Sequence, residues 1–345
     1  MPEAILEPDL PIIDPHHHLW DRAALLSQLP PPAHGFDHVL RRRPRYMADE
    51  LVADMKSGHN VRATVFVDCG AMYRLDGPQE LKSLGETEFV NGVAAMGASG
   101  QFGDARPCAS IVGNVALGLG ARVGDILDQH VTISGGRFKG LRNSASYDPD
   151  PDVLGARWRA MTPGIYLGKE FREGFAQLGK RNLSFDAWML EPQLPDLIDL
   201  ARAFPDTRIM LDHVGTPLGI GTYKGKREER FATWRKNMSE LAKSENVFVK
   251  LGGLAMPFCG FDSCLAEPAA ASAQLAKEWK PYIEASIEAF GVNRCMFESN
   301  FPVDAVTCDY PTLWNAFKRI AAGYSASEKT ALFSQTAANF YRITL

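Results

Sequence analysis

The sequence lacks the features that mark membrane-spanning or secreted proteins. None of its apolar runs reaches the ~18 residues that a transmembrane helix needs. Its first residues, MPEAILEPDLP, hold acidic residues and prolines in place of the basic start and apolar stretch of a signal peptide. We therefore expect a cytoplasmic protein that does not enter a membrane.

The chain also has little excess charge and no paired cysteine motif. Its formal net charge of −4 over 345 residues offers no basic surface for nucleic acid or anionic lipid. The six cysteines form no Cys-x-x-Cys pair, so we expect them to be reduced and to pack as small apolar side chains. These absences favour a protein that acts on a small molecule, without nucleic acid or membrane as partner.

No glycine-rich phosphate loop follows the first strand-like segment, which argues against a dinucleotide-binding fold. The chain does contain eight short segments rich in β-branched and aromatic residues, separated by stretches long enough for helices. This alternation predicts an α/β protein with parallel strands, and eight such units favour a closed (β/α)8 TIM barrel. The expected strands span residues 10–18, 61–69, 106–114, 137–143, 182–190, 207–214, 246–253 and 293–301.

We expect residues 1–345 to form one barrel domain, because such barrels run from ~200 to over 400 residues. Two connections are longer than usual, at about 19–50 and 254–272. Both follow the carboxyl end of an expected strand, where barrel enzymes carry their active sites. They are candidate substrate lids, and ordinary surface insertions are the alternative.

The most unusual motif is Asp-Pro-His-His-His, which ends the first expected strand. Because side chains alternate along a strand, His16 and His18 share one face and His17 takes the other. His213 ends the sixth strand and can complete a trio with that pair. Neutral imidazoles so placed suit a divalent metal or a polarised carbonyl, whereas histidines that merely pack or lie at the surface are the alternative reading.

The eighth strand ends in Glu-Ser-Asn-Phe-Pro-Val-Asp. Alternation points Glu298 and Asn300 the same way, one layer apart. A carboxylate near the histidines can take a proton from an attacking water, and Glu298 and Asp304 are the candidates for this role. A structural ion pair is the alternative for either one.

Further strand ends offer groups that can bind a substrate. Lys139 and Arg142 on the fourth strand, with Arg45 from the first long connection, suit a substrate carboxylate or a developing oxyanion. Asp186, Trp188 and Lys250 are additional candidates, and Gly252-Gly253 would let a ligand approach the backbone. Surface charge is the alternative for the cations.

Five motifs in order give the chain a family resemblance: IIDPHHHLWD, FKGLR, QLPDLIDLARAFPDTRIMLDHVGTP, NVFVKLGGL and CMFESNFPVD. Over nearly its whole length the chain resembles the amidohydrolase-related lactonases of the second amidohydrolase family, which include sugar-lactone and pyrone-dicarboxylate lactonases. The resemblance implies a distorted (β/α)8 barrel that hydrolyses its substrate with an activated water. It also implies that His16, His18 and His213 are the site histidines.

The chain departs from this family at Asn300, where an aspartate usually acts as proton shuttle. An amide cannot be a general base, and it weakens a site for a divalent cation. The fifth strand also lacks the metal-bridging lysine or histidine of other amidohydrolases, which argues against a binuclear centre. Some members of the group need no metal, so the resemblance implies either no cofactor or one divalent metal such as Zn²⁺ on His16, His18 and His213.

The sequence thus predicts a hydrolase that opens the lactone of a small organic or sugar acid. A decarboxylase or amide hydrolase on the same barrel is the first alternative. A binding protein that lost its strand-8 aspartate is the second, because fold alone does not fix function. The expected partner is a small carboxylated substrate, and the sequence is compatible with a homo-oligomer.

Overall fold

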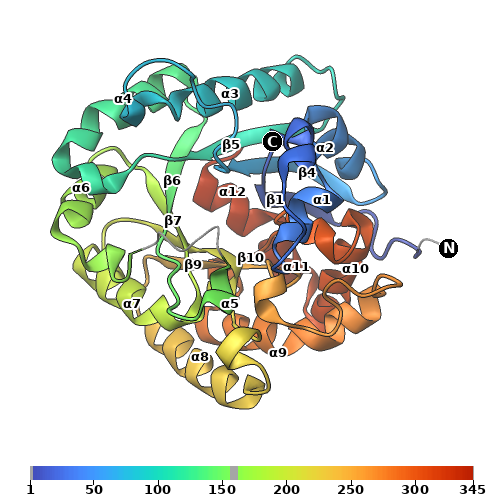
Figure 1. Ribbon diagram of the computed structural model, residues 1–345. Coiled ribbons are helices and arrows are strands. Elements are labelled where there is room, and N and C mark those ends of the chain that lie inside the picture. The colour runs from blue at the N-terminus through green and yellow to red at the C-terminus, as the bar shows by residue number, and fades with distance from the viewer. Residues whose placement is uncertain (1–2, 156–161, 345) are drawn as a thin grey trace.

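The fold was analysed in a computed structural model that describes residues 3–155 and 162–344. Its centre is an eight-stranded parallel sheet in which strands follow one another in chain order. The first and last strands close on each other, because the backbone N–H of His18 donates to the carbonyl of Phe301 at 2.7 Å and that of Asn300 to the carbonyl of His16 at 2.9 Å. The predicted barrel is confirmed (Figure 1). Its strands are β1 (Pro11–His17), β4 (Asn60–Val67), β5 (Arg106–Gly113), β6 (Phe138–Ser144), β7 (Ser184–Trp188), β8 (Ile209–Leu211), β9 (Val247–Leu251) and β10 (Cys295–Phe297).

Helices surround the strands on the outside (Figure 1). Side chains of the outer strand face, such as Ile12, Phe66 and Leu141, belong to one large apolar cluster with the helices. Because both faces of each strand are buried, the strands are nearly continuous apolar runs. The helices are α1 (Asp37–Arg42), α2 (Ala48–Met55), α3 (Leu84–Ala98), α4 (Val123–Ile133), α5 (Pro151–Leu154), α6 (Lys169–Gly179), α7 (Leu194–Ala203), α8 (Arg227–Leu241), α9 (Ser272–Phe290), α10 (Tyr310–Ile320), α11 (Ala326–Thr330) and α12 (Thr336–Tyr341).

The last helix, α12, closes the barrel at the amino ends of the strands. Phe340 and Tyr341 pack against inward-facing residues such as Ile13, Val65 and Met210. In Figure 1 this red helix lies inside the ring of outer helices. Within the described residues, no helix has the length and apolarity needed to cross a membrane. The barrel is therefore plugged at one end, and its carboxyl end remains for a ligand.

The two long connections lie together at that carboxyl end. The first folds into a short antiparallel pair, β2 (Trp20–Asp21) and β3 (Arg45–Tyr46), with α1 between them. Its Phe36 ring stacks on Phe258 of the second connection, with 5.1 Å between ring centroids. Trp20, Leu40 and Met256 join the same small apolar cluster. Both insertions thus wall the same face of the barrel, where we expected lids.

Candidate active site

The end of β1 presents its histidines to opposite faces of the strand. His16 and His18 face inward, and their Nε2 atoms lie 3.3 Å apart. His17 faces outward, where the hydroxyl of Thr64 lies 2.8 Å from its Nε2. Burial, with the positive Lys250 near one ring and Arg142 near the other, lowers the pKa of both inward histidines, so they are neutral. The arrangement is the one that strand alternation predicts.

His213 joins this pair from the end of β8. Its ring centroid lies 4.6 Å from that of His16. The chain turns sharply here, with a φ of 57° at His213. Gly253 makes the turn fit, because a Cβ atom there would stand only 2.4 Å from Cγ of His213. Imidazoles from β1 and β8 therefore meet at one rim of the barrel.

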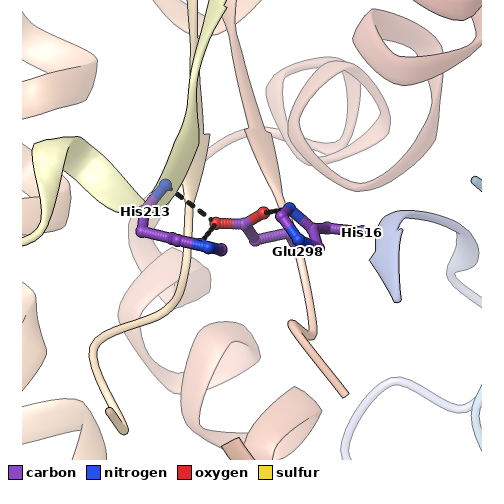
Figure 2. A group of neighbouring side chains, drawn as sticks. All are labelled: His16, His213 and Glu298. Atoms are coloured by element: carbon purple, nitrogen blue, oxygen red, sulfur yellow. Dashed lines mark hydrogen bonds and ion pairs between the residues drawn. The ribbon is translucent and has the colours of Figure 1, made fainter. Parts of the chain in front are cut away.

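Glu298, just after β10, connects the two histidines (Figure 2). One carboxylate oxygen accepts hydrogen bonds from Nδ1 of His213 at 2.7 Å and from its backbone N–H at 3.1 Å. The other oxygen lies 2.8 Å from Nδ1 of His16. Burial alone would raise the pKa of Glu298, but His213 and His16 lower it to about 2, so the group stays ionised. Gly252 leaves the space, because its Cβ would lie 2.4 Å from Cγ of Glu298.

Asn300 and Asp304 form a second pair beside the histidines. Asn300 lines the pocket with a φ of 53°, and its amide donates to Asp304 at 2.8 Å. Burial, with Glu298 nearby, raises the pKa of Asp304 well above its ordinary value. Asp304 therefore lies behind Asn300 as a buried acid, and it is not among the residues that line the pocket.

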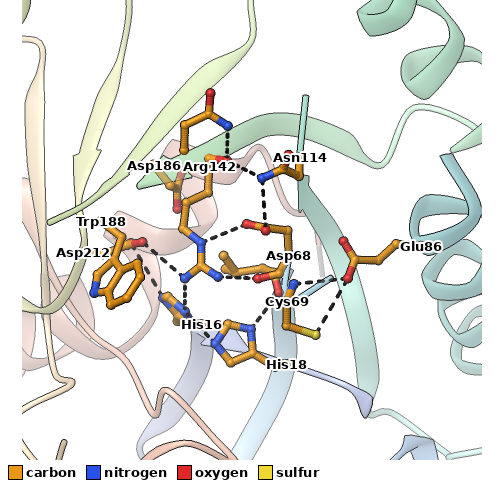
Figure 3. A network of polar contacts seen from close by, with 12 residues as sticks. His16, His18, Asp68, Cys69, Glu86, Asn114, Arg142, Asp186, Trp188 and Asp212 are labelled. Atoms are coloured by element: carbon orange, nitrogen blue, oxygen red, sulfur yellow. Dashed lines mark hydrogen bonds and ion pairs between the residues drawn. The ribbon is translucent and has the colours of Figure 1, made fainter. Parts of the chain in front are cut away.

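Arg142 of β6 reaches the histidines from the opposite wall (Figure 3). Its Nε donates to Asp68 at 2.8 Å, and its Nη2 donates to the carbonyl of the same residue. These two hydrogen bonds direct Nη1 toward Nε2 of His16, 3.4 Å away. A guanidinium held this way can polarise an oxygen atom of a bound ligand.

Beneath His16 lies a fully buried cluster of Lys250, Asp186, Asp212 and Tyr341. The ammonium of Lys250 donates to Asp186 at 2.6 Å and to Asp212 at 2.9 Å, and its Nζ lies 3.2 Å from Nδ1 of His16. Tyr341 of α12 donates its hydroxyl proton to Asp186 at 2.7 Å. Asp186 and Lys250, predicted to touch the substrate, lie under the histidines and do not line the pocket.

The structure does not bring the other two predicted cations to the histidines. Arg45 lies on β3, where it pairs with Asp49 and Glu50 at the surface. Lys139 lies three residues before Arg142 on β6, where the pairing with β5 is irregular, and its carbonyl accepts a hydrogen bond from Arg342 near the chain end. Burial and Arg342 lower the pKa of Lys139. Lys139 is thus near the chain end that plugs the barrel, and neither cation is placed to bind a substrate carboxylate in this pocket.

The pocket above the histidines has a volume of about 170 Å³. It lies between the barrel rim and the two insertions. Trp188 is the one predicted substrate-binding residue besides Arg142 that lines it. The full lining is His18, Trp20, Arg22, Phe36, Val39, Leu40, Cys69, Arg142, Trp188, His213, Met256, Asn300 and Val303.

Three residues of this site escaped the sequence analysis. Asp68 positions Arg142, Asp212 binds Lys250, and Arg22 lines the pocket. Asp212 and Arg22 each stand within four residues of a candidate histidine, in LDH and HLWDR. Adjacency to the histidine motifs was the signal available for them, and Asp68 had a comparable one as the polar residue that directly follows β4.

Comparison with known proteins places this arrangement in a family. A family model described as amidohydrolase matches residues 13–343. The chain belongs to this family. It is an enzyme of the amidohydrolase superfamily, as the motifs predicted.

Two relatives and one solved structure show how far the similarity extends. Uncharacterized protein y4mH of Sinorhizobium fredii is 34% identical over 345 residues, 97% of this chain and 99% of the relative. An L-fucono-1,5-lactonase of Burkholderia ambifaria is 27% identical over 336 residues, 96% of this chain and 95% of the relative. A zinc-bound amidohydrolase structure from Burkholderia multivorans matches with a TM-score of 0.71 at 24% identity, covering 96% of this chain and 99% of that one. The last similarity supports the fold.

The amidohydrolase site contains groups that could hold a metal ion. The 3.3 Å between Nε2 of His16 and Nε2 of His18 suits two ligands of one tetrahedral ion with Zn–N distances of about 2.0–2.1 Å. The carbonyl of Val67 lies 2.8 Å from Nδ1 of His18, which leaves Nε2 free to bind. His16, His213 and Glu298 also bring ligand atoms within 4.8 Å of one another. The imidazole pair therefore fits a divalent metal, although Arg142 and the neutral Asn300 supply no anion for it.

Proposed function

We propose that this amidohydrolase hydrolyses a lactone of a small organic acid with an activated water. The observation that carries the proposal is the 2.7 Å contact of Glu298 with His213, which lines the same pocket as His18 and Arg142. The pair supplies a base, and the opposite wall supplies groups for a carbonyl oxygen. Both are needed to add water to an ester.

The base in this mechanism is His213. Its Nδ1 donates to Glu298, so its Nε2 carries the lone pair that can take a proton from water. A buried carboxylate that fixes the tautomer of a histidine base is the arrangement of the serine hydrolases, used here on water. The pair thereby takes the role of the aspartate that is usual at position 300, where this chain has an asparagine. Glu298 itself stays unprotonated, because its pKa is about 2.

The electrophilic side is formed by Arg142, and the strand-1 histidines would contribute to it by holding a divalent ion. The lactone carbonyl oxygen would lie near Nη1 of Arg142, because Nε2 of His18 has no hydrogen to donate while its Nδ1 donates to the carbonyl of Val67. Negative charge that develops on this oxygen is stabilised there by the guanidinium. A divalent ion held by His16 and His18 would polarise the same oxygen.

The remaining step opens the ring. The hydroxide formed by proton transfer to His213 adds to the carbonyl carbon, and the ring C–O bond then breaks. The leaving alkoxide takes the proton back from His213, so the product is the hydroxy acid and the enzyme is unchanged. Asn300 lines the pocket beside His213 and can orient the water by hydrogen bonding.

The test is a panel of five- and six-membered lactones assayed by acid release, with wild type, His18→Ala and the matched control His17→Gln. We expect His18→Ala to lose well over ~10²-fold in kcat/KM, and His17→Gln to stay active because His17 faces away from the pocket. Near-normal turnover by His18→Ala would overturn the proposal. So would release of CO2 without ring opening, or ligand binding without turnover, which match the decarboxylase and binding-protein alternatives.

A further inference from the structure

Arg22 differs from the other pocket cation in having no acidic partner. Its Nη2 donates to the carbonyl of Cys69 at 2.6 Å, and its guanidinium carbon lies 5.1 Å from the ring centroid of Trp20. Within residues 3–155 and 162–344, no carboxylate forms an ion pair with it. Arg142, by contrast, is neutralised by Asp68. A half-buried guanidinium with one anchored end and free donors is suited to a planar anion such as a carboxylate.

Arg22 and His18 are anchored by the same segment of the chain. His18 is held by the carbonyl of Val67 and Arg22 by the carbonyl of Cys69, two residues further along the same segment. The two anchoring carbonyls are thus at most ~7 Å apart, and both side chains line the same pocket. A ligand bound in that pocket can therefore react at one subsite, beside His18, and place a carboxylate at the other, at Arg22, without a long linker.

The walls between these subsites are mostly apolar. Trp20 contacts both subsites. Its ring stacks on His18 with 6.0 Å between centroids, and the guanidinium of Arg22 lies over the same ring. The other apolar lining residues are Phe36, Val39, Leu40, Met256 and Val303. A hydroxyl-rich ring would lose hydrogen bonds to water against these side chains, whereas a ring with few hydroxyls would not. The volume of about 170 Å³ is also below the ~300 Å³ at which typical pockets for drug-sized ligands begin.

We infer that the substrate is a single-ring lactone that carries one carboxylate and few hydroxyls, and that Arg22 selects it by binding that carboxylate. The inference rests on the proposed function and narrows it. It separates this chain's preferred substrate from hydroxyl-rich sugar lactones. Arg22 is thus a specificity residue, while Arg142 acts at the reacting carbonyl.

The experiment compares kcat/KM for δ-valerolactone, for its 6-carboxylate derivative and for L-fucono-1,5-lactone. We expect wild type to prefer the carboxylated ring over both others. Arg22→Met should lower the ratio of carboxylated to neutral substrate by about 10- to 100-fold, the range for one charged hydrogen-bonded pair. Arg22→Lys should keep more of that ratio than Arg22→Met, because it keeps the charge. Arg45→Met, which removes an arginine of the same insertion that is paired with Asp49 at the surface, should keep the wild-type ratio.

A binding measurement separates failure of this inference from failure of the proposed function. Cyclohexanecarboxylate is titrated calorimetrically into wild type and Arg22→Met, because it has the ring and the carboxylate but no bond to hydrolyse. Arg22-dependent binding together with no hydrolysis of any lactone would remove the proposed function and leave the anion site in place. Hydrolysis with the same ratio in wild type, Arg22→Met and Arg22→Lys, or a preference for L-fucono-1,5-lactone, would overturn the inference and leave lactone hydrolysis standing.

Discussion

The two sides of His16 are built in opposite ways. Below it, each charged group of the buried cluster contacts an opposite charge, because one ammonium, that of Lys250, lies between Asp186 and Asp212. Tyr341 donates a further hydrogen bond to Asp186. Above it, the pocket presents Arg22 without a carboxylate partner among the described residues, beside apolar walls. Paired charges fix side chains in place, whereas an unpaired one is available for a ligand. The difference indicates which residues hold the site and which receive the substrate.

Glu298 belongs to the supporting side, although it was predicted as a base. Both of its oxygens are directed at imidazoles, and it does not line the pocket. In the proposed mechanism, Glu298 orients His213 by accepting hydrogen bonds from its Nδ1 and its backbone N–H. A carboxylate that acts through a histidine can be distinguished experimentally from one that meets water directly.

The largest effect on activity is expected for Glu298→Gln, which removes the carboxylate that contacts both His16 and His213. The amide keeps the size of the side chain but can stabilise the wrong tautomer of His213. By analogy with the aspartate of a serine protease triad, kcat should fall by about 10³- to 10⁴-fold. The measurement is single-turnover and steady-state hydrolysis of the preferred lactone.

Asp304→Asn is the matched control for this variant. An amide at position 304 can still accept the hydrogen bond from Asn300, and the carboxyl there is a buried acid whose pKa is already raised. We expect a loss of less than about 10-fold, well below the range for a missing acid–base group. A reversal of the two results would make Asp304 the functional carboxylate and remove Glu298 from the mechanism.

Lys250→Met tests the paired side directly. It leaves Asp186 and Asp212 buried without their cation, and removal of one partner from a buried pair costs about 3–5 kcal/mol of unfolding free energy. Urea denaturation gives the value, and Lys280→Met, in an exposed helical pair with Glu284, is the control that should change little. A Lys250→Met protein as stable as wild type would show that the buried cluster does not need its charge.

The sequence was sufficient for the framework and for the paired histidines. Parallel strands buried on both faces are dense in apolar residues, so all eight were found, and their carboxyl ends located the site. The contacts of Glu298 with His16 and His213 could not be predicted, because they depend on the space that Gly252 and Gly253 leave just after β9. Arg45 was predicted in place of Arg22 because both lie in the first long connection, and the residue types do not show how this connection folds. Lys139 was misplaced because the irregular pairing of β6 with β5 beside it cannot be recognised from the residue types.

A smaller effect is expected for Asn300→Asp, which adds the missing anion to the pocket side. A carboxylate at position 300 would supply a divalent ion on His16 and His18 with an anionic ligand from the pocket side, in addition to Glu298 on the buried side. We expect at least a roughly tenfold gain in Zn²⁺ affinity, about 1.4 kcal/mol, measured by competition with a chromogenic chelator. Asn300→Ser is the neutral control. Unchanged affinity in Asn300→Asp would place the metal site away from position 300.

The smallest effect concerns Glu86 of α3, which supports the pocket side from outside (Figure 3). One oxygen of this buried carboxyl accepts the backbone N–H groups of Cys69 at 3.1 Å and Ala71 at 2.8 Å, and so fixes the segment whose carbonyl holds Arg22. Burial and the nearby Asp68 raise the pKa of Glu86 to about 8 from its ordinary 4.5. Folding therefore favours the protonated form of this group.

The sign of the pH effect follows from that shift. Because the folded pKa is the higher one, the contribution of Glu86 to stability is complete below about pH 4.5 and is lost as the pH rises toward 8. Glu86→Gln keeps the acceptor and does not titrate, so its stability relative to wild type should increase steadily between pH 5 and pH 8. Urea midpoints at three pH values measure this difference, and Glu88→Gln, two residues along the same helix and exposed, should show no comparable trend. A stability difference that does not change between pH 5 and pH 8 would mean that Glu86 is ionised over this whole range. The segment that holds Arg22 would then be fixed by a carboxylate and not by a neutral acid.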